Sequence, residues 1–158
     1  MSLILDGSAG VTFPNSTVQA SSGVVLQVVN ATFSTESGTS STSFVATGLA
    51  GTITPKFANS KILATFNVTT YQSTGVNCWI TLYRGTTSGK NLGNGINGLG
   101  AGYVASSGSK GNVGSTVLDS PATTSAQVYT LAFRADSGTQ YICSENSTAT
   151  LTLMEIAG

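Results

Sequence analysis

Hydrophobic and polar residues alternate along much of this chain with a period of two, the spacing of a β-strand that is buried on one face. Residues 61–71 show the pattern most clearly, and the apolar residues that share one of their faces are Ile62, Ala64, Phe66 and Val68. The same alternation predicts strands at residues 76–84, 127–135 and 149–156. Shorter runs predict further strands at residues 24–34, 43–47, 51–54 and 139–144.

Signals for helices are almost absent from the sequence. No window places apolar residues at the i, i+3, i+4, i+7 spacing of an amphipathic helix. Clusters of Gly, Ser, Asn and Asp separate the predicted strands, as they do in antiparallel sandwiches. We therefore expect an all-β fold: an antiparallel, jelly-roll-like β-sandwich over residues 23–158, preceded by an extended N-terminal arm.

Two predicted strands place large apolar residues away from the expected core. In residues 76–84, the face opposite the core carries Trp79 and Tyr83. In residues 149–156 the apolar positions shift to Met154 and Ile156, which indicates a bulge or a strand covered on both sides. Because aromatic residues favour buried contacts between proteins, we expect an interface between copies of the chain at Trp79, Tyr83, Met154 and Ile156, which the family resemblance given below implies is a trimer interface. A platform on which Trp79 and Tyr83 stack sugars is the alternative.

Residues 1–22 have too few apolar residues to fold alone and too many for an inert tail. Segments of this kind usually bind a partner surface. We interpret residues 1–22 as an attachment arm whose partner-binding residues are Leu3, Leu5, Val11, Phe13, Pro14 and Val18. The alternative is an edge strand that folds back onto the sandwich of its own chain.

Residues 85–115 are rich in glycine and contain little that would pack in a core. We expect a long exposed loop, with at most a short strand around residues 101–105, and candidate ligand contacts at Asn94, Asn97 and Tyr103. A surface loop without a ligand is the alternative. Residues 93–98 match G-x-G-x-x-G, but no helix is predicted after them, so a dinucleotide site is not expected.

Charged residues make up only 8% of the chain, where about 25% is usual. The net charge is zero and no Lys/Arg cluster occurs, so we expect no nucleic-acid binding. The absence of histidine removes the commonest general base, the Ser-His and Cys-His nucleophile pairs and nearly every zinc site. The six acidic residues form no close pair on one face of a predicted strand. We therefore expect no enzymatic activity, no cofactor and no metal.

The first ten residues lack the basic segment of a signal peptide. The longest apolar stretch, residues 24–29, is far shorter than the ~20 residues of a membrane span. We therefore expect no membrane association and a chain that stays soluble in the cytoplasm where it is made. In a reducing cytoplasm, two buried thiols are favoured over a disulfide between Cys78 and Cys143.

Residues 10–19, with the sequence GVTFPNSTVQ, resemble an N-terminal element of many tail-fibre and virion proteins of tailed phages. The later stretches that resemble a small domain of structural proteins from marine and cyanobacterial phages are residues 25–29, 31–34, 41–45, 47–49, 53–55, 60–63 and 150–157. This resemblance covers nearly the whole chain except the glycine-rich segment. It implies a trimeric β-sandwich without catalytic activity, located in the virion after assembly in the host cytoplasm.

A tail fibre normally carries a long shaft, whereas this chain passes from Met1 directly into the arm. We therefore expect a capsid decoration (cement) protein or a short head fibre, with the major capsid protein or another virion protein as its partner. The arm would add its backbone to a capsid sheet, and three arms of a homotrimer would bind with avidity. The alternative is a tail-fibre or tail-tip receptor-binding module that recognises host surface polysaccharide through residues 85–115 or Trp79. A glycan-cleaving enzyme is a weaker third hypothesis.

Overall fold

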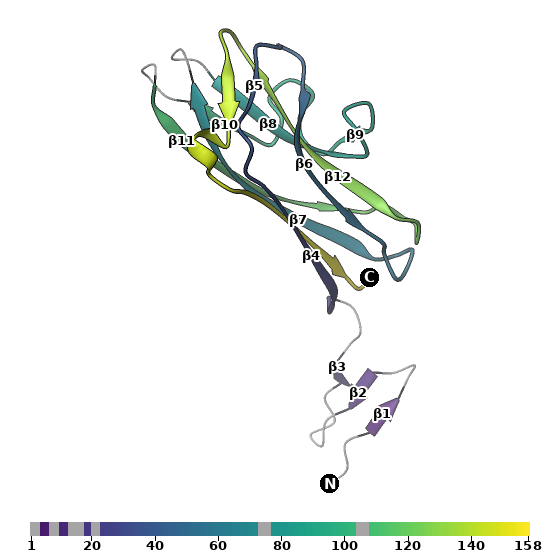
Figure 1. Ribbon diagram of the computed structural model, residues 1–158. Coiled ribbons are helices and arrows are strands. Elements are labelled where there is room, and N and C mark those ends of the chain that lie inside the picture. The colour runs from purple at the N-terminus through teal and green to yellow at the C-terminus, as the bar shows by residue number, and fades with distance from the viewer. Residues whose placement is uncertain (1–3, 7–9, 13–17, 20–22, 73–76, 104–107) are drawn as a thin grey trace.

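The computed structural model describes residues 4–6, 10–12, 18–19, 23–72, 77–103 and 108–158. Two antiparallel sheets pack face to face and form a β-sandwich, as predicted (Figure 1). The first sheet has the order β10-β8-β12-β6 with β9 beside β8; its strands are β6 (Val45–Ile53), β8 (Asn77–Arg84), β9 (Lys90–Asn91), β10 (Gly100–Tyr103) and β12 (Gln127–Ala135). The second has the order β4-β14-β7-β13-β5 with β11 also beside β7; its strands are β4 (Val25–Phe33), β5 (Ser37–Thr39), β7 (Lys61–Gln72), β11 (Lys110–Asp119), β13 (Gln140–Ile142) and β14 (Ala149–Ile156).

The core lies between the two sheets and is formed by the alternating residues that the sequence predicts. Side chains exposed by at most 1% are Ile62, Ala64, Phe66 and Val68 of β7, Cys78, Ile80 and Leu82 of β8, Tyr129, Leu131 and Phe133 of β12, and Leu151 and Leu153 of β14. The outer face of β12 is covered as well, since Thr130, Ala132 and Arg134 are also buried. Val76 lies outside the described residues. Both cysteines are buried and unpaired, as expected.

The described residues contain one short 3-10 turn, η1 (Ser144–Asn146), and no α-helix. None of their elements is therefore a helix of the length and hydropathy needed to cross a bilayer. This agrees with the lack of helical periodicity in the sequence.

The two strands predicted at residues 43–47 and 51–54 are one continuous strand, β6. Gly48 in the middle of β6 has a φ of +99°, and its position leaves no room for a side chain because a Cβ would lie 2.7 Å from the Phe33 ring. The pairing of β6 with β12 shifts register between Thr130 and Ala132, opposite Gly48. A glycine bulge thus bends the strand without ending it.

The prediction that residues 85–115 form one long loop is wrong over part of this segment. It contains β9, β10 and the first half of β11, and β10 corresponds to the short strand expected around residues 101–105. β11 pairs with β7 without interruption from Lys110 opposite Tyr71 to Asp119 opposite Ile62. Its inner face carries Val113, Ser115 and Val117, separated by glycine and polar residues. This weak local pattern becomes a strand because a long partner supplies its hydrogen bonds.

The predicted irregularity in the last strand is present, but the apolar residues do not turn toward the core. Along β14 the alternation stays in phase: Leu153 and Glu155 are buried, and Met154 and Ile156 are half-buried on the outer face. The pairing with β4 shifts register between Glu155 and Ile156. Met154 and Ile156 face outward because the carboxylate of Glu155 takes the position on the core side.

The arm contains three short strands, β1 (Ile4–Asp6), β2 (Gly10–Thr12) and β3 (Val18–Gln19), which pair antiparallel with one another. Leu5 lies opposite Val11, and Val18 lies opposite Thr12. Among the described residues, these strands pair with none of the sandwich strands. Leu3, Phe13 and Pro14 lie outside the described residues. The segment that leads into β4 is joined to the end of β14 by hydrogen bonds from Gly23 N to Ala157 O (2.9 Å) and from Ala157 N to Val24 O (2.9 Å).

Candidate functional site: a cleft around Arg134

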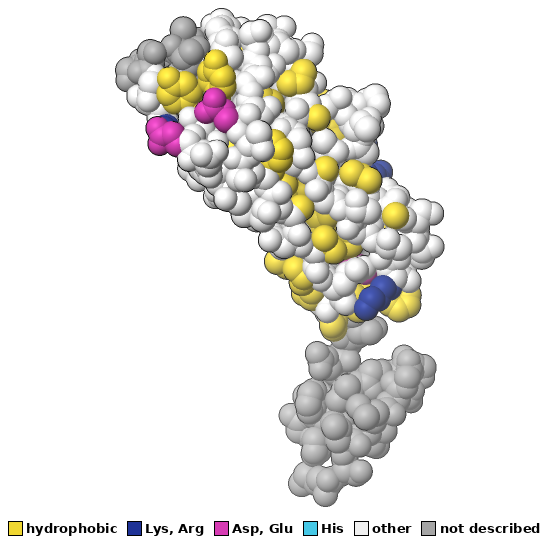
Figure 2. All heavy atoms as spheres, viewed as in Figure 1, with side chains coloured by type: hydrophobic (Ala, Val, Ile, Leu, Met, Phe, Trp, Pro, Cys, Tyr) yellow, Lys and Arg dark blue, Asp and Glu magenta, His cyan; other side chains and the backbone are white. Residues whose placement is uncertain are grey.

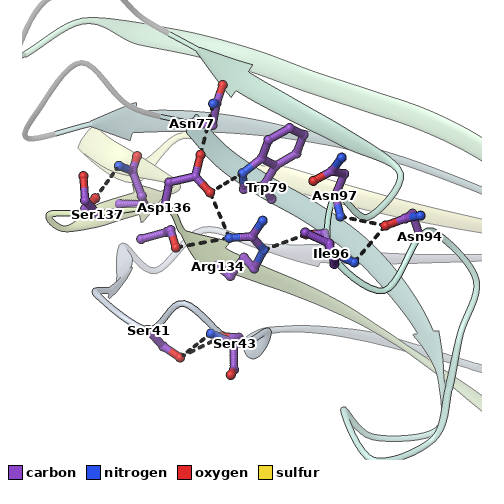
Figure 3. Close-up of polar contacts among 12 residues, drawn as sticks. Ser41, Ser43, Asn77, Trp79, Asn94, Ile96, Asn97, Arg134, Asp136 and Ser137 are labelled. Atoms are coloured by element: carbon purple, nitrogen blue, oxygen red, sulfur yellow. Dashed lines mark hydrogen bonds and ion pairs between the residues drawn. The ribbon is translucent and has the colours of Figure 1, made fainter.

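The outer face of the first sheet carries an arginine opposite a tryptophan. Cys78 and Ile80 of β8 point into the core, so Trp79 between them points outward. On the neighbouring strand β12, Arg134 is the direct register partner of Trp79. The two side chains therefore lie side by side on the outer face (Figure 3).

Arg134 is only 8% exposed, and its guanidinium lies between two aromatic rings. Its Cζ is 5.5 Å from the Trp79 ring centroid and 5.8 Å from that of Phe44. Its Nε donates to Ile96 O at 2.6 Å, and its Nη1 donates to Asp136 Oδ1 at 2.9 Å. Contacts of this kind compensate the desolvation of a buried cation and fix its orientation.

Asp136 receives three hydrogen bonds at the edge of this cluster. Trp79 Nε1 donates to Oδ1 at 2.6 Å, Asn77 Nδ2 donates to Oδ2 at 3.1 Å, and Arg134 supplies the third. Burial alone would raise the pKa of Asp136, but these hydrogen bonds and the charge of Arg134 hold the pKa below its ordinary value. At neutral pH the two side chains therefore form an ion pair of zero net charge.

The segment after β9 folds over this face because both of its ends are fixed to β8. Leu92 N donates to Leu82 O at 2.9 Å, and Leu99 N donates to Ile80 O at 2.8 Å. Between them, Asn94 Oδ1 accepts hydrogen bonds from the backbone N–H groups of residues 96 and 97 at 2.8 and 3.1 Å. The G-x-G-x-x-G run at residues 93–98 thus forms a tight turn at the edge of a sheet.

A cleft of about 390 Å³ opens between this turn and the segment that precedes β6. The residues that line it are Thr42, Ser43, Phe44, Tyr83, Thr87, Gly95, Ile96 and Arg134. We refer to it as the Arg134 cleft. Most of its exposed lining is polar, with hydroxyl and guanidinium groups beside the side chains of Phe44, Tyr83 and Ile96.

The structure separates the four residues predicted for a trimer interface into two groups. Trp79 and Tyr83 lie beside the Arg134 cleft, and Tyr83 is only 9% exposed, with its ring 6.3 Å from that of Phe44. Met154 and Ile156 lie on the outer face of the other sheet. The trimer interface remains a prediction: Trp79, Met154 and Ile156 are half-buried, and Tyr83 is buried.

The predicted loop contacts are exposed but do not line the cleft. Asn94 and Asn97 are exposed at the turn, and Tyr103 is 62% exposed on β10. The sequence patterns did not identify Arg134 or Phe44 as residues of a binding site. Arg134 is the only charged residue in the strand predicted at residues 127–135, and that isolated charge was the signal that could have identified it.

A second feature is an apolar row that crosses the outer face of the second sheet. Val28 on β4 lies opposite Met154 on β14, Met154 lies opposite Leu63 on β7, and Leu63 lies opposite Leu118 on β11. Val28 is 57% exposed and Leu118 is 52% exposed. We call these four residues the apolar row. Figure 2 shows hydrophobic side chains gathered at the end of the sandwich where β4 begins.

The next row across the same four strands is polar, and its members are Asn30, Thr152, Thr65 and Thr116. They bond in pairs: Thr152 Oγ1 donates to Asn30 Oδ1 at 3.2 Å, and the hydroxyls of Thr65 and Thr116 are 3.0 Å apart. The apolar surface therefore ends sharply along the sheet. The residues that the structure describes include no group of three or more His, Cys, Asp or Glu side chains able to hold a metal ion.

No protein-family model matches the chain, and no curated protein matches it in sequence. Among solved structures, the chain is similar to a mutant VP2 protein of infectious bursal disease virus in derived T=1 particles, with a TM-score of 0.44 and 10% identity over 83% of this chain and 36% of that one. The viral particle of the same virus matches with a TM-score of 0.44 and 10% identity over 92% of this chain and 39% of that one. The enzymatically active domain of bacteriophage CBA120 tailspike protein 4 matches with a TM-score of 0.27 and 10% identity over 76% of this chain and 19% of that one. The chain thus spans well under half the length of each of these proteins.

Proposed function

We propose that this protein is a non-enzymatic structural protein of a phage virion that decorates the capsid as a cement protein or short head fibre. The observation that carries the proposal is the arm. Its strands pair only with one another among the described residues, and its sequence GVTFPNSTVQ resembles the N-terminal element of tailed-phage virion proteins. Because the arm does not pair with the sheets of its own chain, it is available to bind a partner.

The apolar row supports self-association. Val28 and Leu118 at the ends of the row are more than half exposed, and adjoining exposed apolar side chains can serve as a contact surface. Charged residues are scarce and the net charge is zero, so many copies could pack on a shell with little mutual repulsion. A trimer joined through this face would present three arms to one capsid site, and avidity would raise the binding strength without any new contact.

Removal of the arm tests this function. We expect a variant without residues 1–22 to lose co-sedimentation with phage heads that lack the protein, while its circular dichroism and oligomeric mass stay those of the full chain. Val11→Asp within the full chain should weaken binding in the same direction, because the charge lies on a strand of the arm. Tyr103→Ala, on β10 of the sandwich, is the matched control and should bind normally.

Head binding that persists without the arm would overturn the proposal. If removal of the arm also abolished adsorption to host cells, the result would favour a receptor-binding module of the tail.

A further inference from the structure

The burial of Arg134 costs desolvation free energy, although its side chain does not contribute to the core between the sheets. It is more than nine-tenths buried, yet it lies on the outer face of β12 and lines a cleft that opens to solvent. Its guanidinium is fixed through Nε and Nη1, and Nη2 makes no hydrogen bond among the described residues. A donor held in a fixed orientation beside an open cleft is typical of a binding site.

We propose that the Arg134 cleft binds a neutral saccharide unit of a glycan. Sugars present an apolar C–H face and a rim of hydroxyl groups, and the cleft offers a counterpart to each. Phe44, Tyr83 and Ile96 supply the apolar walls. Arg134 supplies a donor, and the hydroxyls of Thr42, Ser43 and Thr87 can both donate and accept.

The charge of the cleft favours a neutral ligand over an anionic one. Arg134 is the only charged residue among those that line the cleft. Its charge is already matched by Asp136 at 2.9 Å, so an anion would find no unpaired cation. At about 390 Å³, the cleft lies at the lower end of the ~300–1,000 Å³ range of small-molecule sites. A short glycan segment fits this volume.

Both walls of the cleft are held in place before any ligand binds. On one side, Ser41 O accepts from Ala135 N at 2.8 Å, and Ser41 Oγ bonds to the backbone of Ser43 at 2.8 and 3.1 Å. On the other side, the turn that carries Ile96 is held by Asn94 and by its own hydrogen bond to Arg134. A preformed site loses little entropy on binding, which matters for ligands as flexible and hydrated as sugars.

This inference goes beyond the proposed function and is independent of where the arm docks. The test uses the full chain. We would screen it on a glycan array and then titrate neutral trisaccharides of glucose, galactose, mannose and N-acetylglucosamine by saturation-transfer NMR, with trigalacturonate as the acidic comparison. We expect binding of at least one neutral glycan, with contacts from its C–H protons.

Three variants locate the site. Ile96→Ala should weaken binding about three- to tenfold without affecting folding, because Ile96 is 70% exposed and its backbone carbonyl still reaches Arg134. Arg134→Lys should weaken binding at least about tenfold because lysine lacks the planar fork of donors. Tyr103→Ala, exposed on β10, is the matched control and should leave binding unchanged.

The proposal is overturned if no glycan on the array binds, if only acidic glycans bind, or if Ile96→Ala and Arg134→Lys leave the binding of a neutral glycan unchanged. Because the measurement needs no capsid, a failure of the arm to dock would leave the outcome unaffected.

Discussion

Asp119 shows how a single carboxylate can tie the two sheets together. It ends β11 of the second sheet, is 3% exposed, and accepts hydrogen bonds from three residues of the first. Arg84 Nη1 lies 3.0 Å from Oδ2, Lys90 Nζ lies 3.3 Å from Oδ1, and Tyr129 Oη donates to Oδ2 at 2.9 Å. Burial, together with this carboxylate, raises the pKa of Tyr129 well above its ordinary value, so the phenol stays a donor.

Replacement of Asp119 by Asn should therefore lower the stability of the folded protein. The amide has nearly the same shape but removes the charge that Arg84 and Lys90 pair with. We expect the free energy of unfolding to fall by about 2–4 kcal/mol in urea denaturation, since one partner of a buried network is lost. Glu36→Gln, at an exposed position, is the control and should change stability by less than about 0.5 kcal/mol. Equal effects of the two substitutions would contradict this account.

Glu155 makes stability depend on pH. Its carboxylate is fully buried and accepts from Gln27 Nε2 at 2.6 Å and from the backbone N–H of Lys56 at 2.7 Å. Burial raises the pKa of Glu155, but these hydrogen bonds outweigh it and hold the pKa below the ordinary 4.5. A lowered pKa in the folded state stabilises the fold above pH 4.5, and this stabilisation is lost as the pH falls through the folded-state value.

We therefore expect the melting temperature to fall on acidification below about pH 4.5. Glu155→Gln should be less stable than the parent at neutral pH and should show a smaller fall in acid. Differential scanning calorimetry from pH 7 to pH 3 measures both. An unchanged acid profile in the variant would show that other carboxylates cause the loss.

The two cysteines should be unreactive toward thiol reagents in the folded protein. Both are fully buried, and burial raises the pKa of Cys78 to about 12. The thiolate is the reactive form, so neither thiol should react with Ellman's reagent under native conditions. After denaturation in guanidinium both should react. Rapid labelling of the native protein would mean that the strands carrying Cys78 or Cys143 open readily.

At the scale of the element, the turn after β9 depends on one glycine. Gly98 has a φ of +62°, and a Cβ there would lie 2.3 Å from the carbonyl oxygen of Ile80. That carbonyl accepts the hydrogen bond from Leu99 that fixes the turn to β8. The Arg134 cleft therefore depends on a position where the backbone of β8 comes too close for any Cβ, so only glycine fits there.

Gly98→Ala should lower the free energy of unfolding by about 1–3 kcal/mol and increase proteolysis at Lys90. Gly95→Ala is the matched control in the same turn, because a Cβ at Gly95 meets nothing within 4 Å. Its effect should stay below about 0.5 kcal/mol. Similar losses from both substitutions would show that the turn is sensitive to any side chain.

At the scale of the whole molecule, the apolar row is the surface through which copies of the chain would meet. Its four members belong to four strands and form one surface only when the second sheet is assembled. The polar row beside it limits this surface to one end of the sheet. This end also holds the start of β4, so an oligomer joined there would keep its arms together.

Native mass spectrometry should give a mass of about 48 kDa, three times the 15.9 kDa of one chain. Val28→Asp, at the exposed end of the apolar row on β4, should shift the mass toward that of the single chain because an aspartate would be buried unpaired in the contact. Tyr103→Asp, on the other sheet, should leave the mass unchanged. A parent protein that is already monomeric would remove the avidity on which the proposed attachment depends.

The sequence by itself determined which residues face the core. The alternation in β7, β8 and β12 is a consequence of local strand geometry, so Phe66, Ile80 and Leu131 could be assigned to the interior without knowledge of their partners. It also placed Trp79 on the outer face. The missing histidines and the low charge limited the available chemistry before any fold was known.

Only the tertiary structure decided the rest, because register and long-range pairing are not encoded in a local period. β11 is a strand because β7 lies beside it, and Glu155 occupies a core position because backbone N–H groups far along the chain meet it there. Arg134 faces Trp79 because β12 and β8 pair in one particular register. A shift of one residue would turn Arg134 toward the core and remove the cleft.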